Sequence, residues 1–416
     1  MRIALVNVGC KVNRVEIDGV AAQLLDEGAQ LAEQGAADIV IVNTCTVTGE
    51  AEKKTRKAVR QALKRNPGAQ LLVTGCAVAI DPGEFSRIDP RVHVVGKAQV
   101  APAAWELSGE QAHSVHPDGQ DAADAAVHLR MGGGFRTRVG IKVQDGCNNA
   151  CTYCIVHVAR GVPVSTPADR VASEVSRYAA AGARELVLTG INLGTYDSDG
   201  LLLPDLVRRL LPLVPDGRIR ISSVEPCDVS DDLIRLLAAS DGRVCRHLHL
   251  PLQSGSSRVL QQMARPYDAE AFLDLMSRLR AAVPQLSVST DIIVGFPGET
   301  EEDFRQTLAV ARAAAFSKIH VFRYSRRAGT PAAARSDQVP ADVIADRASR
   351  LADLGRELAY NDAARRAGTR ERILVERTGR GTTESYHTAH VPDTFETGEL
   401  VELTLTEPSP DGIFLL

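Results

Sequence analysis

Three cysteines in the first hundred residues each follow a segment that reads as a buried strand. The pairs of segment and cysteine are 2–9 with Cys10, 38–44 with Cys45, and 70–75 with Cys76. Because the carboxyl ends of parallel strands lie along one edge of a sheet, the three thiols are expected to meet there and ligate one site. A single cysteine after a strand is ordinarily a small buried residue, but three in equivalent places favour metal ligation. Three thiolates leave one position open in a tetrahedral zinc site or on a cubane iron–sulfur cluster.

A second cysteine triad lies on one short loop, with the spacing C-x3-C-x2-C. Its members are Cys147, Cys151 and Cys154. Three soft thiolates on such a loop can bind three irons of a cubane cluster and leave the fourth iron exposed. Zinc is the alternative, but common zinc patterns add a second cysteine pair or histidines at set distances, and none follows here. Cys227 and Cys245 belong to neither triad, and we interpret them as buried or incidental thiols.

The elements that must position these cysteines alternate between strand and helix. Helical patterns at 16–27 and 50–65 separate the first three strands, which predicts a parallel sheet. Six more strand candidates recur at intervals of roughly 30 residues, with helical patterns such as 168–181 and 269–282 between them. This alternation predicts a partial (βα)6 barrel, and the functional site of such a barrel lies at the carboxyl ends of its strands. Those strands are 138–143, 185–188, 218–222, 247–250, 288–294 and 319–324.

An amphipathic helical pattern at 341–367 precedes short β-rich segments at 370–416. The predicted fold class is therefore α/β, with an N-terminal parallel α/β sheet, a central partial barrel and a small C-terminal antiparallel β-barrel. The predicted domains are 1–107 for the sheet, 108–134 for a Gly-, Asp- and His-containing linker, 135–366 for the barrel and 367–416 for the terminal β-domain.

Composition limits the class of protein. The chain has 416 residues, 44% hydrophobic and 24% charged, which excludes disordered, collagen-like and disulfide-stapled miniprotein classes. No apolar run approaches the roughly 20 residues of a membrane span, and the N-terminus lacks a secretory pattern. We therefore expect a cytoplasmic protein whose thiols stay reduced. The net charge of −4 argues against a broadly basic, nucleic-acid-binding surface.

The C-x3-C-x2-C loop resembles that of the radical S-adenosylmethionine (SAM) superfamily. The resemblance implies that the open iron binds SAM, and that reduction of the cluster releases a 5′-deoxyadenosyl radical. It also implies that Tyr153, just before the last cysteine, lies against the adenine of the cofactor. Residues after the later barrel strands match the cofactor-contact regions of the superfamily: Thr189, Gly190, Ser223, Glu225, Gln253 and Asp291.

Two open clusters on one chain, followed by a small β-domain, resemble the methylthiotransferase family over essentially the full length. The resemblance implies two [4Fe–4S] clusters, the second of which carries sulfur, and SAM as both methyl donor and radical source. It implies further that the segment 376–416 is a TRAM module, which holds substrate RNA. Tyr153 and the six residues above are then the cofactor contacts, and beyond the cluster ligands no catalytic residue is assigned.

Short motifs favour the MtaB-type branch, which modifies N6-threonylcarbamoyladenosine at position 37 of tRNA. They are Gly9-Cys10-Lys11-Val12-Asn13 and Asn43-Thr44-Cys45-Thr46-Val47-Thr48. The branch that acts on isopentenyladenosine usually has Gln-Met before this asparagine, and the branch that acts on a ribosomal-protein aspartate usually has Pro-Lys. Lys11, Asn13 and Asn43 become candidates for substrate contact, although a structural role in the loops fits each of them equally.

The resemblance names partners as well as cofactors. It implies tRNA, a flavodoxin- or ferredoxin-like electron donor and a sulfur source, with no membrane association. Seven basic residues between 53 and 65 form a helical patch that could neutralise phosphates, or simply a solvated helix face. The terminal segment 370–416 has four basic and nine acidic residues, so RNA binding there would need a local stripe such as Arg377 and Arg380.

Two residues depart from the family pattern after the second triad. His157 stands where a proline is usual, and Val164 where an arginine is usual. His157 could be a ligand or proton carrier, but a packed loop histidine is the simpler interpretation. A protein of another class, a metal-binding RNA adaptor with zinc in one or both triads, is the non-enzymatic alternative.

Overall fold

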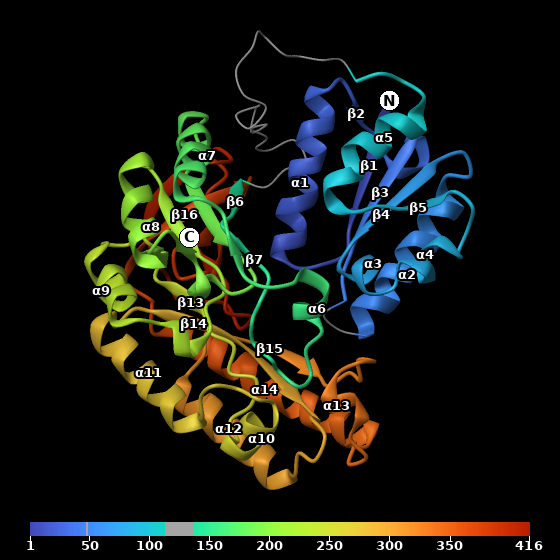
Figure 1. Cartoon of the computed structure of the whole chain (residues 1–416). Coiled ribbons are helices and arrows are strands. Elements are labelled where there is room, and N and C mark those ends of the chain that lie inside the picture. The colour runs from blue at the N-terminus through green and yellow to red at the C-terminus, as the bar shows by residue number, and fades with distance from the viewer. Residues whose placement is uncertain (47–48, 113–136) are drawn as a thin grey trace. The chain divides into compact units, whose positions relative to one another are not determined.

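The computed structural model describes residues 1–46, 49–112 and 137–416 (Figure 1). The chain forms two compact units. The first comprises Met1–Phe135, Gly146–Asn148 and Cys154–Val162, and the second comprises Arg136–Asp145, Asn149–Tyr153 and Pro163–Leu416. The cysteine loop 147–154 therefore contributes residues to both units. The predicted linker falls largely within 113–136, outside the described residues.

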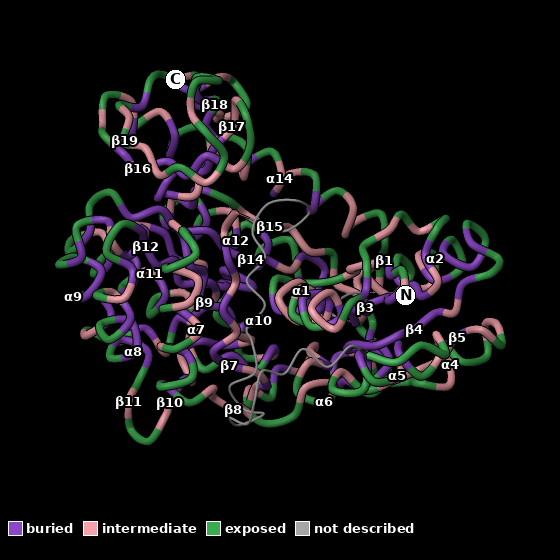
Figure 2. The backbone as a smooth tube through the Cα atoms, turned by 90° about the horizontal axis from the view of Figure 1, so that it is seen from above, coloured by how far each residue is buried: buried purple, intermediate pink, exposed green. Residues whose placement is uncertain are grey.

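The first unit is built on a parallel sheet of strand order β2-β1-β3-β4-β5. Its strands are β1 (Arg2–Asn7), β2 (Gln30–Leu31), β3 (Ile39–Thr44), β4 (Gln70–Gly75) and β5 (Val92–Val94). Every residue of β3 is buried, which is typical of a strand with helices on both faces (Figure 2). Val40 and Val42 enter one hydrophobic cluster, while Ile39 and Ile41 enter the other, because successive side chains point to opposite faces.

Two helices separate the first three predicted strands, as the sequence predicts, with shifted ends: α1 (Lys11–Asp26) and α2 (Gly49–Arg65). The unit also contains α3 (Cys76–Ile80), α4 (Pro82–Ser86), α5 (Val100–Ser108) and α6 (Val156–Arg160), which were not predicted. The first helix begins at Lys11, whereas the sequence pattern predicts its start at residue 16. Cys10 occupies its N-cap without a side-chain capping bond, so the usual start signal is missing from the sequence.

The second unit contains six parallel strands in two groups of three. One group has the order β12-β9-β6 and the other β13-β14-β15. Isolated parallel bridges between Ile219 and Val244, and between Ser223 and His249, join the two groups along one curved array. The strands are β6 (Arg138–Lys142), β9 (Glu185–Thr189), β12 (Arg218–Ile221), β13 (His247–His249), β14 (Ser287–Val294) and β15 (Lys318–Arg323). This is the half-barrel that the sequence predicts.

Helices fill the intervals between the barrel strands, and two more follow the last strand. Those between strands are α7 (Ala168–Ala180), α8 (Leu203–Leu210), α9 (Asp231–Ala239), α10 (Ser257–Gln262), α11 (Ala269–Ala282) and α12 (Glu301–Ala314), and those after β15 are α13 (Pro331–Ala334) and α14 (Ala341–Ala364). Two short antiparallel pairs, missed by sequence patterning, are β7 (Gln144–Asp145) with β8 (Val164–Ser165) and β10 (Asp197–Ser198) with β11 (Leu201–Leu202). No helix within the described ranges is long and apolar enough to cross a membrane.

The terminal segment forms a five-stranded sheet of order β19-β16-β17-β18-β20. Its strands are β16 (Arg370–Arg377), β17 (Arg380–Thr383), β18 (Thr388–His390), β19 (Leu400–Thr404) and β20 (Phe414–Leu415). The prediction of an antiparallel barrel needs correction, because β18 and β20 pair in parallel. An isolated antiparallel bridge between Pro408 and Phe414 brings the chain after β19 back to β20 at the other end of the sheet.

A buried charge cluster attaches this terminal sheet to the barrel. The side chains of Glu185, Arg218 and Arg220 are 0%, 0% and 1% exposed. Both arginines bond the Glu185 carboxylate, at 2.5 Å for Arg218 Nη2 and 2.6 Å for Arg220 Nε. The guanidinium groups also donate to main-chain carbonyls of the terminal sheet, at residues 372, 382, 383 and 384. The terminal sheet is therefore held by buried, charge-assisted hydrogen bonds.

Candidate functional site

The strand register of the first sheet places the first cysteine triad along one edge. Asn7 of β1 is level with Asn43 of β3, and Asn43 is level with Thr74 of β4. Cys10, Cys45 and Cys76 follow these three level positions by two or three residues. Cys45 and Cys76 are buried, whereas Cys10 is exposed. Three thiols at the carboxyl edge of adjacent strands suit a site that is open on one side.

Two buried asparagines tie the cysteine loops together. The Asn13 Nδ2 atom donates to the Thr44 carbonyl at 2.7 Å, and the Asn43 Nδ2 atom donates to the Asn13 carbonyl at 2.7 Å. The Thr44 hydroxyl accepts hydrogen bonds from the backbone of residues 77 and 78, just after Cys76. Asn13 and Asn43 are 0% and 2% exposed, so the structure gives them a loop-holding role. Their contact with substrate stays a prediction, as does that of the exposed Lys11.

Charged groups surround Cys76. Burial raises the pKa of the Cys76 thiol, while the Arg160 guanidinium and the Lys97 ammonium act in the opposite direction. Arg160 lies at the end of α6, which contacts α3, the helix that begins at Cys76. The cations favour the thiolate form that a metal ligand requires.

Gly75 fixes the backbone that presents Cys76. Its φ is +101°, and an added Cβ would lie 2.4 Å from Asn43 Oδ1 and 2.5 Å from the Thr44 carbonyl oxygen. We expect Gly75→Ala to lower the free energy of unfolding by about 1–3 kcal/mol, because the left-handed backbone and the two close contacts are both unfavourable to alanine. Chemical denaturation measures this change.

The matched control is Gly19→Ala in α1, where an added Cβ meets nothing within 4 Å. Removing a helix glycine stabilises by about 0.5–1 kcal/mol, so the control should be neutral or stabilised. Equal responses of the two variants would contradict the assignment of strain to Gly75.

The second cysteine triad lies on a loop whose ends are fixed by the backbone. Within the first unit, Cys147 donates its N–H to the Gly161 carbonyl at 3.0 Å. Gly146, with φ of +77°, lies so close to Val162 that an added Cβ would be 2.0 Å from its carbonyl oxygen. The backbone N–H of Val156 donates to Cys154 Sγ at 3.4 Å. The donor set of three cysteine thiols, one already accepting a backbone N–H, fits an iron–sulfur cluster.

Cys151 accepts a hydrogen bond from a buried arginine of the second unit. Arg265 Nη1 donates to Cys151 Sγ at 3.1 Å, and the same guanidinium is paired with the Glu225 carboxylate. The Tyr267 hydroxyl lies 2.9 Å from Arg265 Nη2. Burial raises the pKa of the Glu225 carboxyl, and Arg265 opposes that rise. Sequence reasoning selects Glu225 but misses Arg265, because no short motif marks a residue whose partners lie 40 and 114 positions away.

The other predicted cofactor contacts lie on neighbouring barrel strands. Thr189 ends β9 and is buried, with its hydroxyl donating to the Ile141 carbonyl at 3.1 Å. Gly190 follows it, and Ser223 follows β12 and bridges His249. Tyr153 packs against a hydrophobic cluster that includes Met263, Phe296 and others of the second unit.

Gln253 and Asp291 are joined through the backbone. Gln253 has φ of 65°, an uncommon conformation for a residue with a side chain, and its N–H donates to the Asp291 carbonyl at 2.8 Å. Such backbone strain clusters at ligand sites. The sequence interpretation treats Asp291 as part of a segment that follows its strand, whereas Asp291 lies inside β14. The register Ser223–His249–Ser289 nevertheless places Asp291 two residues beyond the level of Ser223, toward the carboxyl ends of the strands.

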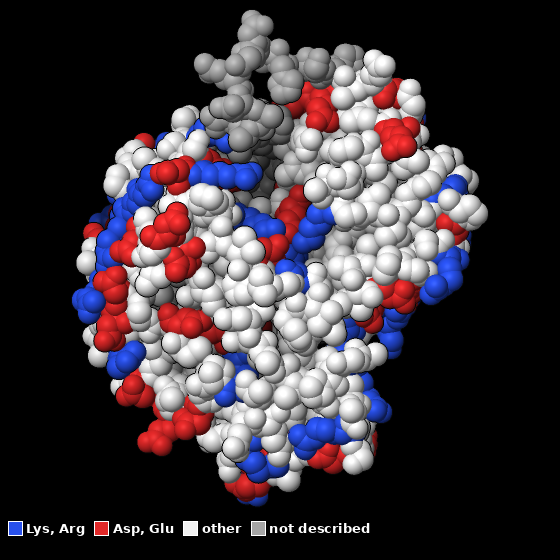
Figure 3. All heavy atoms as spheres, in the orientation of Figure 1, with Lys and Arg blue, Asp and Glu red and all other residues white. Residues whose placement is uncertain are grey.

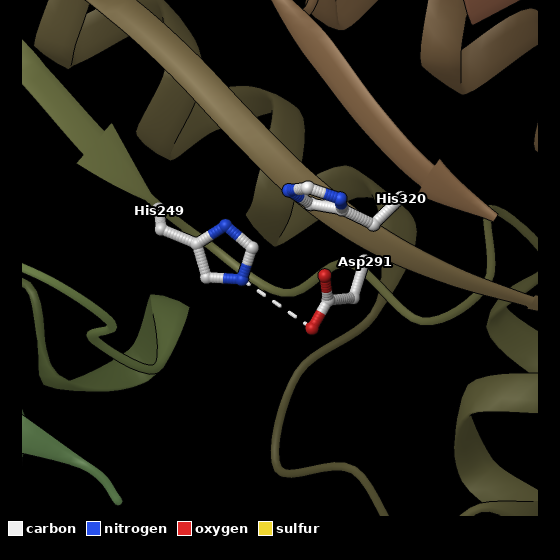
Figure 4. A group of neighbouring side chains, drawn as sticks. All are labelled: His249, Asp291 and His320. Carbon is white, nitrogen blue, oxygen red and sulfur yellow. Dashed lines mark ion pairs between the residues drawn. The ribbon is translucent and has the colours of Figure 1, made fainter. Parts of the chain in front are cut away.

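Asp291 also belongs to a group of three possible metal ligands, with His249 of β13 and His320 of β15 (Figure 4). Their ligand atoms lie within 4.8 Å of one another, and His249 Nε2 is 3.3 Å from Asp291 Oδ2. The Ser289 hydroxyl lies 3.0 Å from His249 Nδ1 and orients the ring. Neither histidine is among the residues predicted from sequence. Imidazole and carboxylate groups here could bind a cation or the hydroxyl groups of a ligand.

The remaining predictions concern the surface and the spare thiols. His157 is exposed on helix α6, so its interpretation as a packed loop histidine is wrong, and Val164 is exposed in β8. Burial raises the pKa of the Cys245 thiol to about 11, which agrees with an inert buried cysteine. Cys227 is exposed instead of buried, and partial burial and the nearby Asp228 raise the pKa of its thiol to about 11 as well.

The basic helix α2 presents most of its cations to solvent. Arg56 is half-buried and pairs with Glu84 at 2.9 Å, and Lys54 pairs with Glu50 at 2.9 Å. The exposed basic residues are Lys53, Lys54, Lys57, Arg60, Lys64 and Arg65. On the face shown in Figure 3, basic and acidic atoms are interspersed, as the small net charge predicts.

Comparison with known families identifies the two units. Residues 141–311 match the radical SAM superfamily, and residues 2–96 match a family described as "Uncharacterized protein family UPF0004". Together with the cysteine loop and the half-barrel, this makes the chain a radical SAM enzyme, a class that uses SAM and a [4Fe–4S] cluster.

Similar proteins indicate the family to which this chain belongs within the radical SAM superfamily. The threonylcarbamoyladenosine tRNA methylthiotransferase MtaB of Thermotoga maritima is 36% identical, with 88% of this chain and 85% of that protein covered. MtaB of Bacillus subtilis is 38% identical, with 87% and 82% covered. The chain belongs to the radical SAM methylthiotransferase family, which confirms the resemblance seen in the sequence.

Solved structures share the fold at lower identity. The radical SAM methyltransferase TsrM of Kitasatospora setae has a TM-score of 0.57 and 16% identity, over 80% of this chain and 77% of that one. The cobalamin-dependent SAM radical enzyme OxsB has a TM-score of 0.52 and 10% identity, over 86% and 57%. These likenesses support the fold.

Proposed function

We propose that this enzyme adds a methylthio group to C2 of N6-threonylcarbamoyladenosine at position 37 of tRNA, beside the anticodon. The observation that carries the proposal is the presence of two cysteine triads, one after three parallel strands and one on a single loop, in a chain 36–38% identical to MtaB enzymes. The motif Gly9-Cys10-Lys11-Val12-Asn13 supports the same branch.

In this proposal each cysteine triad holds one [4Fe–4S] cluster. Cys147, Cys151 and Cys154 bind the cluster that cleaves SAM, and Cys10, Cys45 and Cys76 bind the auxiliary cluster. When bound, these groups supply a 5′-deoxyadenosyl radical and a methylated sulfur, with SAM serving both reactions. The protein contributes ligation, orientation and a controlled electrostatic environment.

The residues of the half-barrel position the cofactor. Tyr153 provides a flat surface for adenine, and Gly190 allows close approach of the backbone. The polar groups of Thr189, Ser223 and Gln253 supply hydrogen bonds, and the carboxylates of Glu225 and Asp291 face positive or hydroxyl groups. Because Asp291 is one of these contacts, we assign the His249–Asp291–His320 group to the cofactor site and not to a separate metal centre.

The proposal requires tRNA, an electron donor and a source of sulfur as partners. The exposed cations of α2 begin a few residues after Cys45, so they can contact phosphates near the auxiliary site. A flavodoxin- or ferredoxin-like protein is the donor we expect, in the cytoplasm. The acidic terminal sheet has a net charge of −5 over 370–416, so we assign the electrostatic part of RNA binding to α2.

Isopentenyladenosine in tRNA is the second candidate substrate. The tRNA-2-methylthio-N(6)-dimethylallyladenosine synthase of Saccharopolyspora erythraea is 36% identical, with 91% of this chain and 79% of that protein covered. Overall identity therefore does not separate the two branches. The dipeptide Lys11-Val12 before Asn13 does, because the other branch usually has Gln-Met there.

Mass spectrometry of tRNA nucleosides tests the substrate. A strain that lacks this protein should lose 2-methylthio-N6-threonylcarbamoyladenosine and accumulate its unmodified parent, and re-expression should restore the product. Loss of the methylthiolated isopentenyladenosine instead would identify the other branch. Persistence of both nucleosides, in a strain with no other such enzyme, would contradict the tRNA proposal.

Iron analysis tests the cluster count. Protein purified without oxygen and reconstituted should hold about eight iron atoms per chain, four for each [4Fe–4S] cluster. Zinc without iron would support the RNA-adaptor alternative and contradict a radical mechanism.

A further inference from the structure

Arg160 connects the loop of one predicted cluster to the ligands of the other. It lies six residues after Cys154, and its side chain is 2% exposed. Within the first unit, its Nη2 atom donates to Asn13 Oδ1 at 2.7 Å, and its Nη1 atom pairs with Glu16 Oε1 at 3.1 Å. Helix α6, which ends at Arg160, contacts helix α3, and the positive charge of the guanidinium acts to lower the pKa of the Cys76 thiol against the effect of burial.

The Asn13 oxygen is shared with a cysteine of the auxiliary triad. Cys10 Sγ lies 3.3 Å from Asn13 Oδ1, the same atom that accepts from Arg160. A thiolate ligand has no proton to donate, so after Cys10 binds metal this oxygen keeps Arg160 as its donor. The bond to Arg160 therefore does not compete with ligation by Cys10, and it fixes Asn13 in the orientation that holds the Cys10 and Cys45 loops.

Two cations beside Cys76 pair with the same carboxylate, that of Glu16. Glu16 is paired with two cations, Arg160 at 3.1 Å and Lys97 Nζ at 2.8 Å. Arg160 and Lys97 both act on Cys76, because the positive charge of each favours the thiolate form of its side chain. Net charge and hydrogen bonds to the sulfur ligands are among the factors that set the reduction potential of an iron–sulfur cluster.

We propose that Arg160 is a positioning residue of the auxiliary cluster, holding the Cys10 and Cys45 loops through Asn13 and raising the reduction potential of the cluster through its charge beside Cys76. This inference rests on the proposed function, because it requires a cluster on Cys10, Cys45 and Cys76. It adds an electrostatic link between that cluster and the segment that follows Cys154.

The experiment is a potentiometric titration followed by electron paramagnetic resonance, on the full chain. In a background in which Cys147, Cys151 and Cys154 are alanine, the auxiliary cluster is observed alone. We expect Arg160→Gln to lower the reduced-to-oxidised ratio at a fixed potential at least tenfold, which corresponds to about 59 mV for a one-electron couple. Arg160→Lys keeps the charge and should restore most of this ratio.

The control is Arg2→Gln, which removes another arginine of the same unit, one paired with Asp38 at 2.8 Å in an exposed position. It should leave the ratio unchanged. An unchanged ratio in Arg160→Gln with normal iron content would overturn the inference, and so would equal shifts in the Gln and Lys variants, since those would indicate a purely structural effect. Loss of iron from both variants alike would likewise reject the charge effect. Absence of a cluster from the parent protein would instead contradict the proposed function.

Discussion

Cys45→Ala is expected to remove the methylthiolated product while reductive cleavage of SAM continues, whereas Cys147→Ala is expected to abolish both. The two cysteines belong to different triads, and Cys45 is one of the two buried thiols of the first. Alteration of a residue that merely orients a metal ligand typically costs 10- to 100-fold in activity or affinity. Loss of a ligand should therefore reduce product to about one hundredth or less.

The assay measures two products in the same reaction mixture. Chromatography quantifies 5′-deoxyadenosine as the cleavage product, and nucleoside mass spectrometry quantifies the methylthio group on tRNA. Cys227→Ala is the matched control, because Cys227 is exposed and belongs to neither triad, and both outputs should stay at the wild-type level. Cleavage that survives in Cys147→Ala would reject the assignment of the second triad to SAM chemistry.

Glu185→Gln is expected to lower the free energy of unfolding by about 3–5 kcal/mol, because it leaves two buried guanidinium groups without their counter-charge. The Glu185 side chain is 0% exposed and pairs with Arg218 and Arg220. Urea denaturation at pH 7 measures the change. Asp232→Asn is the control, since Asp232 pairs with Arg208 on the surface and such pairs contribute about 0–1 kcal/mol. A loss in Glu185→Gln no larger than in the control would contradict the structural role of the cluster.

The same carboxylate gives the wild-type protein a defined response to acid. Burial raises the pKa of Glu185, but Arg218 and Arg220 lower it more, so its folded-state pKa lies below the ordinary value of 4.5. A carboxyl group with a depressed pKa stabilises the fold above its unfolded pKa, and this stabilisation is lost as the pH falls towards the folded pKa. The wild-type protein should therefore lose stability below about pH 4.5, and Glu185→Gln should show a weaker dependence there.

Much of the architecture could be predicted from the sequence, because parallel strands covered on both faces read as continuous apolar runs. The strand at 70–75 has the same bounds in the structure. Short elements without such a run were missed, including β5 and the pair β7 and β8. The parallel pairing of β18 and β20 could not be predicted either, since pairing direction depends on a long connection and not on local periodicity.

Some residues of the candidate site could likewise be predicted from the sequence, and others could not. The cysteines of the first triad could be located because each follows a recognisable strand, and strand order then places them on one edge. Arg160 and Arg265 could not, because their partners lie far along the chain: 144 residues separate Arg160 from Glu16. The substrate contacts predicted for Asn13 and Asn43 stay a prediction, and the sequence could not show that their amides bond to each other's loops.

The bonds that hold the terminal sheet have an evolutionary consequence. Arg218 and Arg220 contact that sheet through main-chain carbonyls, which are the same whatever side chains the sheet carries. These bonds thus recognise a backbone path, whereas the ion pairs Arg138–Glu376 and Arg246–Glu384 at the same junction depend on side chains of the sheet. A terminal sheet taken from a relative would keep the bonds to Arg218 and Arg220 if its backbone path were the same, and it would also need acidic partners for Arg138 and Arg246.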